Sequence, residues 1–375
     1  MKKITILCGR YLPGYKDGGP VRTIVNLVES LGNQYEFNII TNDRDHGDKK
    51  PYPNILYDKS NRIGKANVFY IKPGEFTLKN IKKLTINTDI IYVCGPYNNY
   101  SYKVLLLKRM NIIKQPVVVA SMGSFSEGAL KIKGKKKKIF IEICKKIGLY
   151  QKISWSVTSK REENDVKNII GKESICYIAE DLPRKINKVD IREVKKNNKE
   201  LKIVFISRIC KIKNLIYVIE ILKEIHGKVV FDIYGPIEDE VYWKECKRLL
   251  EKLPSNIKYS YCGMMDSEKI VDTFLEYDIF VFPTMGENFG HVIFEALSGG
   301  CIPIISDQTP WQDLEEEKCG RIIPLDKKNE YINTINKILK MQHEDLMIIQ
   351  EKANEYAMKK YNESIKNTGY IDIFR

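Results

Sequence analysis

The feature that most restricts the fold is a repeated alternation of wholly apolar segments with amphipathic ones. Runs such as "ITILC", "IIYVC", "PVVVA", "KIVFIS" and "IFVFP" are apolar at almost every position. Strands of this kind are buried on both faces, as happens in parallel sheets that helices cover on both sides. Segments with helical periodicity separate the runs, among them residues 21–31, 102–110, 136–149 and 160–170. The chain is therefore predicted to be an α/β protein with parallel sheets.

The alternation occurs twice, which predicts two domains. A charged stretch, "REVKKNNKEL" at residues 192–201, interrupts it, and the rhythm of strand and helix then begins again. A length of 375 residues also exceeds what one ordinary core supports. We expect two Rossmann-like domains that face each other across a cleft, residues 1–195 and 196–357. A C-terminal helix, at about residues 358–375, is expected to pack back onto the first domain.

The composition indicates a cytoplasmic protein. The apolar runs are far shorter than the ~20 residues that cross a bilayer, and the N-terminal run is too short for the core of a signal peptide. Nine cysteines are scattered without a Cys-x-x-Cys pair, which favours buried thiols in a reducing compartment.

The net charge of +14 is unevenly distributed. The first 200 residues are strongly basic and the remainder is slightly acidic, so a basic face could meet anionic lipid, a phosphorylated acceptor or nucleic acid. The segment from Lys131 to Tyr150 combines a lysine run with Ile139, Phe140, Ile143 and Ile147 on one helical stripe. It is either a helix that packs on the core or a peripheral contact with an anionic membrane surface.

Three loops carry the chemistry, because ligands of open parallel sheets bind beyond the carboxyl ends of the strands. In "GRYLPGYKDGGPVR", Gly18 and Gly19 precede Pro20, an arrangement that lets backbone approach an anion at a helix N-terminus, although a plain tight turn would look the same. In "FISRICKIKNL", Arg208 and Lys213 follow a strand, where they could grip a diphosphate or be solvated surface charges.

The third loop is "PTMGENFGHVIFEALSGG", which contains two carboxylates. Gly286 and Gly290 permit close approach of a ligand, and a helix is expected to begin near His291. Glu295 lies about one turn into that helix and could accept hydrogen bonds from two neighbouring hydroxyls, such as a ribose diol. Glu287 could accept from the hydroxyls of a sugar. The alternative is that both are ordinary surface acids.

The stretch Gly286–Gly300 resembles the Glu–seven residues–Glu motif of retaining glycosyltransferases of the GT-B type, family 4 (glycosyl transferases group 1). Arg208 with Lys213 matches the basic pair of that family, and Gly18-Gly19 matches its N-terminal glycine loop. The segments "YGPIEDEVYW" and "PIISDQTPW" are similar to parts of bacterial surface-polysaccharide members. The specific motifs lie between Arg208 and Trp311, so the first half is matched loosely.

The resemblance implies a retaining transfer of a hexose or N-acetylhexosamine from a nucleotide-diphosphate sugar, with UDP favoured, to a glycan or lipid-linked acceptor of the bacterial cell surface. It implies no metal and no other cofactor, and it makes stabilisation of the leaving diphosphate more important than a protein base. Met122 stands where relatives often carry a histidine, so no catalytic histidine is assigned. The implied catalytic residues are Glu287, Arg208 and Lys213. The implied donor and nucleotide contacts are Gly19, Arg208, Lys213, Gly235, Gly263, Asn288, Phe289, Gly290 and Glu295.

Two other functions were weighed. The basic first half and the tyrosines of "CGPYNNYSYK" suit a nucleic-acid-binding protein, but that function leaves Glu287 and Glu295 without a role, and no nucleic-acid partner is expected. A sugar-nucleotide epimerase on the same fold would need nearby acid–base residues, which no loop supplies. The Asp43-Arg44-Asp45 triplet resembles a metal-binding Asp-x-Asp, and we interpret it as a chance match.

Overall fold

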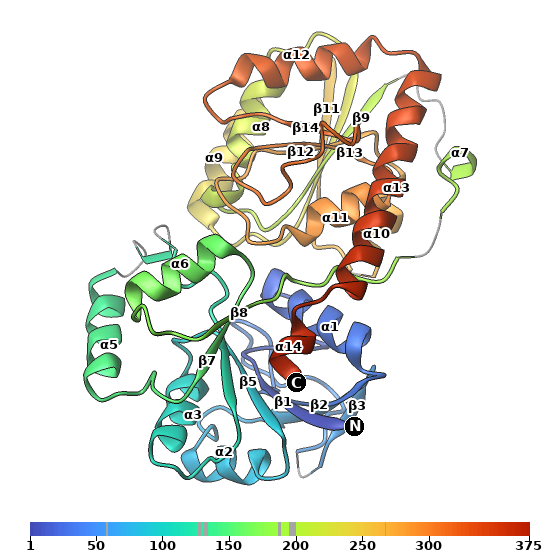
Figure 1. The fold of residues 1–375 in the computed structure, drawn as a ribbon. Coiled ribbons are helices and arrows are strands. Elements are labelled where there is room, and N and C mark those ends of the chain that lie inside the picture. The colour runs from blue at the N-terminus through green and yellow to red at the C-terminus, as the bar shows by residue number, and fades with distance from the viewer. Residues whose placement is uncertain (58, 127–128, 131–133, 187–188, 195–199, 267) are drawn as a thin grey trace. The chain divides into compact units, whose positions relative to one another are not determined.

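The chain forms two compact α/β units (Figure 1). The computed structural model describes residues 1–57, 59–126, 129–130, 134–186, 189–194, 200–266 and 268–375. The first unit comprises residues 1–184 and 364–375, and the second comprises residues 185–363. The chain enters the second unit earlier than residue 196, because Ile186 already belongs to the core of that unit and Ile191 is buried.

The first unit contains an eight-stranded sheet in the order β3-β4-β2-β1-β5-β6-β7-β8. All neighbours run parallel except β3 and β4, which are antiparallel. Strands β5 and β6 are buried along their whole length, as their apolar sequences predict. The strands are β1 (Lys2–Leu7), β2 (Tyr35–Asn42), β3 (Asn61–Ile63), β4 (Ala66–Ile71), β5 (Ile90–Cys94), β6 (Val117–Ala120), β7 (Ser154–Val157) and β8 (Cys176–Ile178).

Side-chain N-caps mark the start of two helices of this unit. The Thr77 hydroxyl accepts a hydrogen bond from the Asn80 N–H at the start of α2, and Ser159 does the same for Glu162 at the start of α6. The expectation that Phe140 shares a stripe with the neighbouring isoleucines is wrong, because its ring packs inward on Tyr97. The helices are α1 (Gly19–Leu31), α2 (Leu78–Thr85), α3 (Asn99–Arg109), α5 (Gly134–Lys146), α6 (Lys160–Ile169) and α14 (Tyr370–Phe374).

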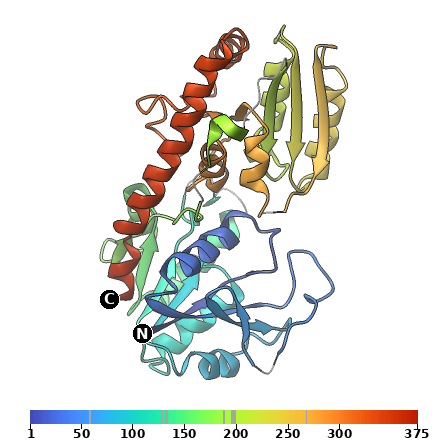
Figure 2. The same ribbon diagram turned by 90° about the vertical axis from the view of Figure 1, so that its right-hand side faces the viewer.

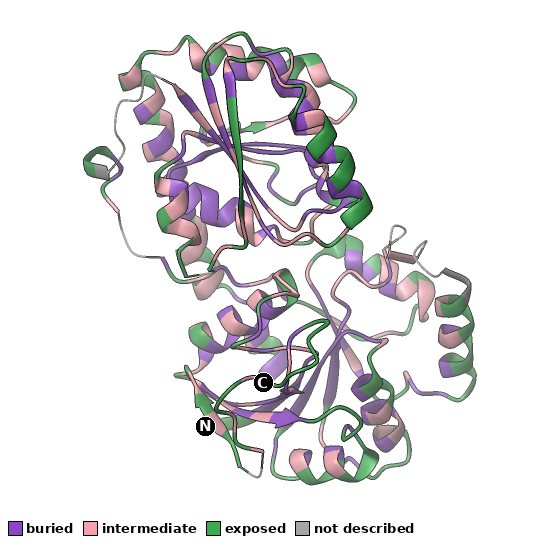
Figure 3. Ribbon diagram, turned by 180° about the vertical axis from the view of Figure 1, so that it is seen from behind, coloured by how far each residue is buried: buried purple, intermediate pink, exposed green. Residues whose placement is uncertain are grey.

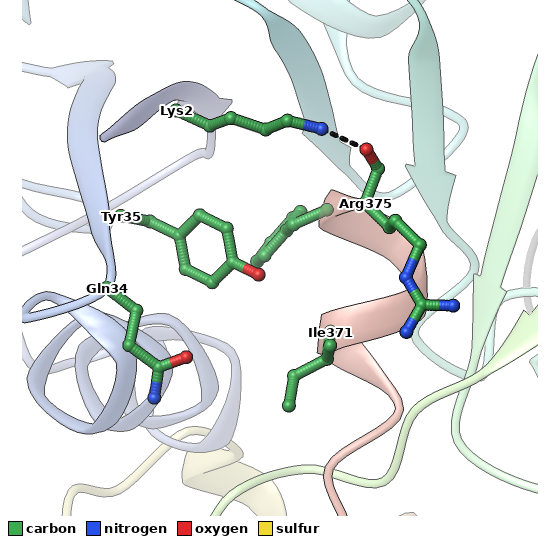
Figure 4. Close-up of a pocket in the computed structure, with 6 residues that line it drawn as sticks. Lys2, Gln34, Tyr35, Ile371 and Arg375 are labelled. Carbon is green, nitrogen blue, oxygen red and sulfur yellow. Dashed lines mark hydrogen bonds between the residues drawn. The ribbon is translucent and has the colours of Figure 1, made fainter.

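Helix α14 completes the core of the first unit from the far end of the chain. Phe374 is fully buried, and its ring lies 5.3–6.0 Å from the rings of Tyr35, Phe37 and Tyr92. Lys2 Nζ donates a hydrogen bond to the carbonyl of Arg375 beside it (Figure 4). A pocket of about 350 Å³ opens there, lined by Lys2, Gln34, Tyr35, Ile371, Phe374 and Arg375.

The second unit contains a six-stranded parallel sheet in the order β11-β10-β9-β12-β13-β14. Figure 3 shows the strands of both sheets as mostly buried, between helices whose outer faces are exposed. The two edge strands of this unit are exceptions, since most residues of β11 are exposed and neither residue of β14 is buried. The strands are β9 (Leu201–Ile206), β10 (Val229–Tyr234), β11 (Ile257–Gly263), β12 (Ile279–Phe282), β13 (Ile302–Ile305) and β14 (Arg321–Ile322).

Helices cover both faces of this second sheet, as the sequence predicts. Asp239 begins α9 by accepting from the N–H groups of Val241 and Tyr242. The 24-residue helix α13 lies along the unit (Figure 2) and contributes Ala353, Tyr356 and Ala357 to its core. The helices are α7 (Ile191–Val194), the 3₁₀ turn η1 (Lys211–Lys213), α8 (Leu215–Leu222), α9 (Glu240–Leu250), α10 (Ile270–Leu275), α11 (His291–Ser298), α12 (Lys328–Leu339) and α13 (His343–Lys366).

Candidate functional site

Two loops at the carboxyl ends of β9 and β12 are joined by hydrogen bonds. The Thr284 side chain is fully buried, and its Oγ1 donates to the carbonyl of Ile212 at 3.1 Å. The Met285 N–H donates to the same carbonyl at 2.8 Å. Asn214 adopts a left-handed conformation that asparagine tolerates well, and its Nδ2 donates to the Pro283 carbonyl at 3.0 Å. These contacts hold the loop of Lys213 against the loop of Glu287.

Lys213 and Glu287 consequently form an ion pair. Lys213 Nζ donates to Glu287 Oε1, and the two side chains are only 10% and 15% exposed. The ammonium also lies 5.6 Å from the centre of the Phe282 ring. The Glu287 N–H donates to the Gln308 carbonyl at 3.0 Å, so the backbone under the carboxylate is fixed. The sequence assigned the two residues separately, and the structure brings them together.

Arg208 pairs with a second carboxylate, Glu238. Its Nη1 donates to Glu238 Oε2, and the side chains are 37% and 49% exposed. A β-bridge between Ile209 and Ile237 aligns the backbone beneath this pair. Burial raises the pKa of the adjacent Cys210 thiol, with a smaller contribution in the same direction from Glu238, so this thiol is protonated near neutral pH. Sequence reasoning assigned no role to Glu238, although it stands in "YGPIEDE" just after a strand end.

Trp311 stabilises the turn that leads into α11. Gly290 has φ 77° and caps the helix, and a Cβ there would lie 2.9 Å from the Ile293 side chain. Trp311 Nε1 donates to the Phe289 carbonyl at 2.6 Å, and the two rings pack edge to face. The helix begins at His291, as predicted. The positive end of the α11 dipole therefore lies directly after a rigid Asn288–Phe289–Gly290 turn.

Glu295 is buried in α11, with 4% exposure. A carboxylate is almost never this buried unless it is partnered, so the alternative that Glu295 is an ordinary surface acid is wrong. Three largely buried charged side chains thus belong to one unit. Lys213 and Glu287 form the ion pair, and Glu295 lies in helix α11.

Gly235 and Gly263 are required by the backbone. Gly235 has φ 134°, and a Cβ on it would lie 1.8 Å from the Ser207 carbonyl oxygen. The Gly235 N–H donates to the Gly263 carbonyl at 2.8 Å, and the Gly235 carbonyl accepts from the Tyr261 hydroxyl at 2.8 Å. Gly263 has φ 75° with no atom close to the position of a Cβ, so its requirement is conformational. Contact of either glycine with a donor stays a prediction.

The glycine loop of the first unit is fastened by Asp45. This carboxylate is 3% exposed and accepts from the N–H groups of Tyr15, Lys16 and His46 at 2.9, 3.2 and 2.8 Å. The Asp-x-Asp triplet therefore has a structural role that the sequence did not suggest. Among the described residues, no group of His, Cys, Asp and Glu side chains could hold a metal ion. Gly19 has open space around its Cα, while the preceding Gly18 adopts φ 62° at the helix cap.

Met122 occupies a turn that Glu162 holds in place. Met122 has φ 48°, an uncommon conformation for this residue type. Glu162 is 6% exposed and accepts from the N–H of Gly123 and from the N–H and hydroxyl of Thr158. The turn at the carboxyl end of β6 is thereby rigid.

In the part of the chain that the structure describes, none of the helices has the length and apolar composition that a membrane span requires.

Known proteins share this architecture along the whole chain. The solved structure of Anabaena Alr3699/HepE in complex with UDP and glucose is 14% identical, covers 96% of each chain and gives a TM-score of 0.69. WaaG, a glycosyltransferase involved in lipopolysaccharide biosynthesis, is 12% identical over 97% of each chain with a TM-score of 0.65. An uncharacterized 41.2 kDa protein in the cps region of Klebsiella pneumoniae is 22% identical over 372 residues, which is 96% of each sequence.

The two parallel-sheet units and this likeness show the GT-B fold. Residues 187–360, nearly the whole second unit, match the family described as glycosyl transferases group 1. The match includes Arg208, Lys213, Glu287 and Glu295.

Proposed function

We propose that the protein is a retaining glycosyltransferase that moves a hexose or N-acetylhexosamine from a nucleotide-diphosphate sugar, with UDP favoured, to a glycan or lipid-linked acceptor. The observation that carries the proposal is the buried ion pair of Lys213 with Glu287, whose loop leads into α11, together with the burial of Glu295 within that helix. Burying charged side chains is costly even when they are paired, and a ligand-binding role would account for their retention here.

Each of the charged residues in these loops and in α11 suits one part of the donor. Lys213 offers three N–H donors, so it can bind a phosphate oxygen while it keeps a contact with Glu287. Arg208 binds Glu238 through Nη1, and its fork has further donors for the diphosphate. Glu295 would accept from the ribose diol, and Glu287 would accept from hydroxyls of the sugar. The N–H groups at Asn288, Phe289 and Gly290 would add a partial positive charge for the leaving group.

The cations would act chemically by stabilising charge. When the bond from the anomeric carbon to the diphosphate breaks, negative charge accumulates on the departing oxygen. Two cations and a helix N-terminus oriented toward that oxygen would lower the barrier, because groups oriented in advance need no reorganisation. The departing oxygen would then take the proton of the acceptor hydroxyl. No step in this scheme needs a metal ion or a protein base.

The class of donor and acceptor is supported by the relatives. Alr3699/HepE was solved with UDP and glucose, and the Klebsiella relative is encoded in a cps region. UDP is therefore the nucleotide that we propose, and a surface polysaccharide or its lipid-linked precursor is the product that we propose. The basic first half of the chain is consistent with an anionic acceptor at a membrane surface.

The test is a thermal-shift series with UDP, GDP, ADP and dTDP, followed by donor hydrolysis with the best nucleotide. We expect one nucleoside diphosphate to raise the melting temperature in a saturable way, with and without EDTA. Glu295→Gln should reduce this shift, while Glu355→Gln, an exposed control on α13, should leave it unchanged. Absence of stabilisation by all four nucleotides, together with salt-sensitive retention of an oligonucleotide, would refute the proposal.

A further inference from the structure

Helix α5 presents an apolar stripe to solvent. Ile139, Ile143 and Ile147 follow one another at intervals of four residues and are 61%, 52% and 53% exposed. Residues four apart lie on the same face of a helix, and Ile147 directly follows the last residue of α5. Single exposed apolar residues are ordinary, whereas a row of three marks a surface of interaction.

The opposite face of the same helix makes the contact with the core. Ile141 and Cys144 are each 3% exposed and belong to a hydrophobic cluster of the first unit, and the Phe140 ring lies 6.1 Å from the ring of Tyr97. The helix, labelled α5 in Figure 1, therefore packs through one face and leaves the three isoleucines on another. Packing on the core does not account for the stripe.

The end of helix α3 extends the apolar surface. Arg109 Nε donates to the Ile147 carbonyl at 3.4 Å, which places the C-terminal ends of α3 and α5 together. The next residues, Met110 and Ile112, are 58% and 38% exposed. We call the five residues Ile139, Ile143, Ile147, Met110 and Ile112 the α5 patch.

Lysines surround the α5 patch. On α5 itself Lys136, Lys138, Lys145 and Lys146 are exposed, and Glu142 lies 3.6 Å from Lys145. At the end of α3, burial lowers the pKa of Lys108, and the charges of Lys152 and Lys114 lower it further. Positive charges are crowded at this end, and an anionic surface would relieve their repulsion.

We propose that the α5 patch binds an anionic phospholipid bilayer. The isoleucines and Met110 would enter the boundary between headgroups and acyl chains, and the lysines would contact lipid phosphates. A second copy of the chain is a poorer occupant, because a two-fold contact would bring the same lysines face to face. This inference deepens the proposed function, on which its purpose rests: the enzyme would be held where a lipid-linked acceptor is embedded.

Sedimentation of the full-length protein with sucrose-loaded vesicles tests the inference. We expect binding to vesicles of phosphatidylglycerol and phosphatidylcholine, and much weaker binding to phosphatidylcholine alone. Ile139→Ser with Ile143→Ser should weaken binding about tenfold or more, since both side chains lose their apolar contact. Ile348→Ser, which removes a 44% exposed isoleucine of the second unit, is the matched control.

A charge-reversal pair separates electrostatic from apolar binding. Lys138→Glu with Lys146→Glu should weaken binding to anionic vesicles about tenfold or more, whereas Lys244→Glu with Lys247→Glu on α9 should not. The inference is overturned if wild-type protein ignores anionic vesicles, if it binds neutral vesicles equally well, or if the serine variant binds like wild type. It is also overturned if the serine substitutions abolish a dimer seen in solution. Stabilisation by UDP that persists in each of these cases leaves the proposed function intact.

Discussion

Glu287→Gln provides the sharpest test of the buried ion pair. The substitution keeps the shape of the side chain and leaves the backbone bond from residue 287 to Gln308 in place, but it removes the negative charge beside Lys213. The lysine side chain is 10% exposed, so little water can replace the lost partner. A hydrogen bond to a charged group contributes about 1.5–3 kcal/mol, and the remaining amide oxygen still accepts from Nζ. We therefore expect a loss of about 2 kcal/mol in the free energy of unfolding of the second unit.

The exposed pair of the same loops is a matched control. Arg208 and Glu238 are 37% and 49% exposed, and ion pairs of this kind contribute at most about 1 kcal/mol. Glu238→Gln should consequently lower stability much less than Glu287→Gln. On the melting temperature, the loss from Glu287→Gln corresponds to about 4–8 °C for a unit of this size.

Guanidinium unfolding followed by tryptophan fluorescence is the assay. Two of the three tryptophans, Trp243 and Trp311, lie in the second unit, so the signal follows that unit. A double-mutant cycle with Lys213→Met isolates the pairwise energy. The reasoning is refuted if Glu287→Gln and Glu238→Gln reduce stability equally, or if the cycle gives no coupling between residues 213 and 287.

Three further predictions use the same preparations. Glu295→Gln should weaken nucleotide binding by about 1–3 kcal/mol in titration calorimetry, and an unchanged affinity would contradict its assignment to the ribose. Burial raises the pKa of Asp181 to about 6, with smaller contributions from nearby glutamates. The folded state therefore binds the Asp181 proton more tightly than the unfolded state does. Stability is consequently lost as the pH rises from about 4 to 6. Asp181→Asn should remove that loss, so its gain over wild type should be larger at pH 7.5 than at pH 4. Gly235→Ala should destabilise the second unit by several kcal/mol, of order 3 or more, because its Cβ would overlap the Ser207 carbonyl, while Gly19→Ala should cost little in thermal melts.

The strands and the longer helices could be predicted because their sequences carry strong signals. A run such as Val117–Ala120 is buried at every position, and its wholly apolar sequence predicts that burial. Helix α2 was not predicted, because only Ile81 and Thr85 of its eight residues are buried and too little periodicity results. Strand β3 was also missed. It is three residues long and pairs antiparallel with β4 at the edge of the sheet, where no alternating pattern can develop.

The loops of the candidate site could be predicted, whereas the pairings within them could not. The partners Lys213 and Glu287 are 74 residues apart, and Arg208 and Glu238 are 30 apart. Which carboxylate meets which cation depends on loop contacts such as the Thr284 hydroxyl on the Ile212 carbonyl, and these exist only in the folded unit. The role of Asp45 escaped prediction for the same reason, since two of the three amides that it binds, those of Tyr15 and Lys16, are about 30 residues away.

In the sequence, the second unit is an insertion within the first. Residues 185–363 separate the main part of the first unit from the segment that carries Phe374, whose ring fills space between Tyr35, Phe37 and Tyr92. During synthesis, domains fold as units in the order in which they emerge from the ribosome. The nascent first unit must therefore keep a gap among its aromatic side chains while the whole of the second unit is translated, and helix α14 fills this gap only afterwards.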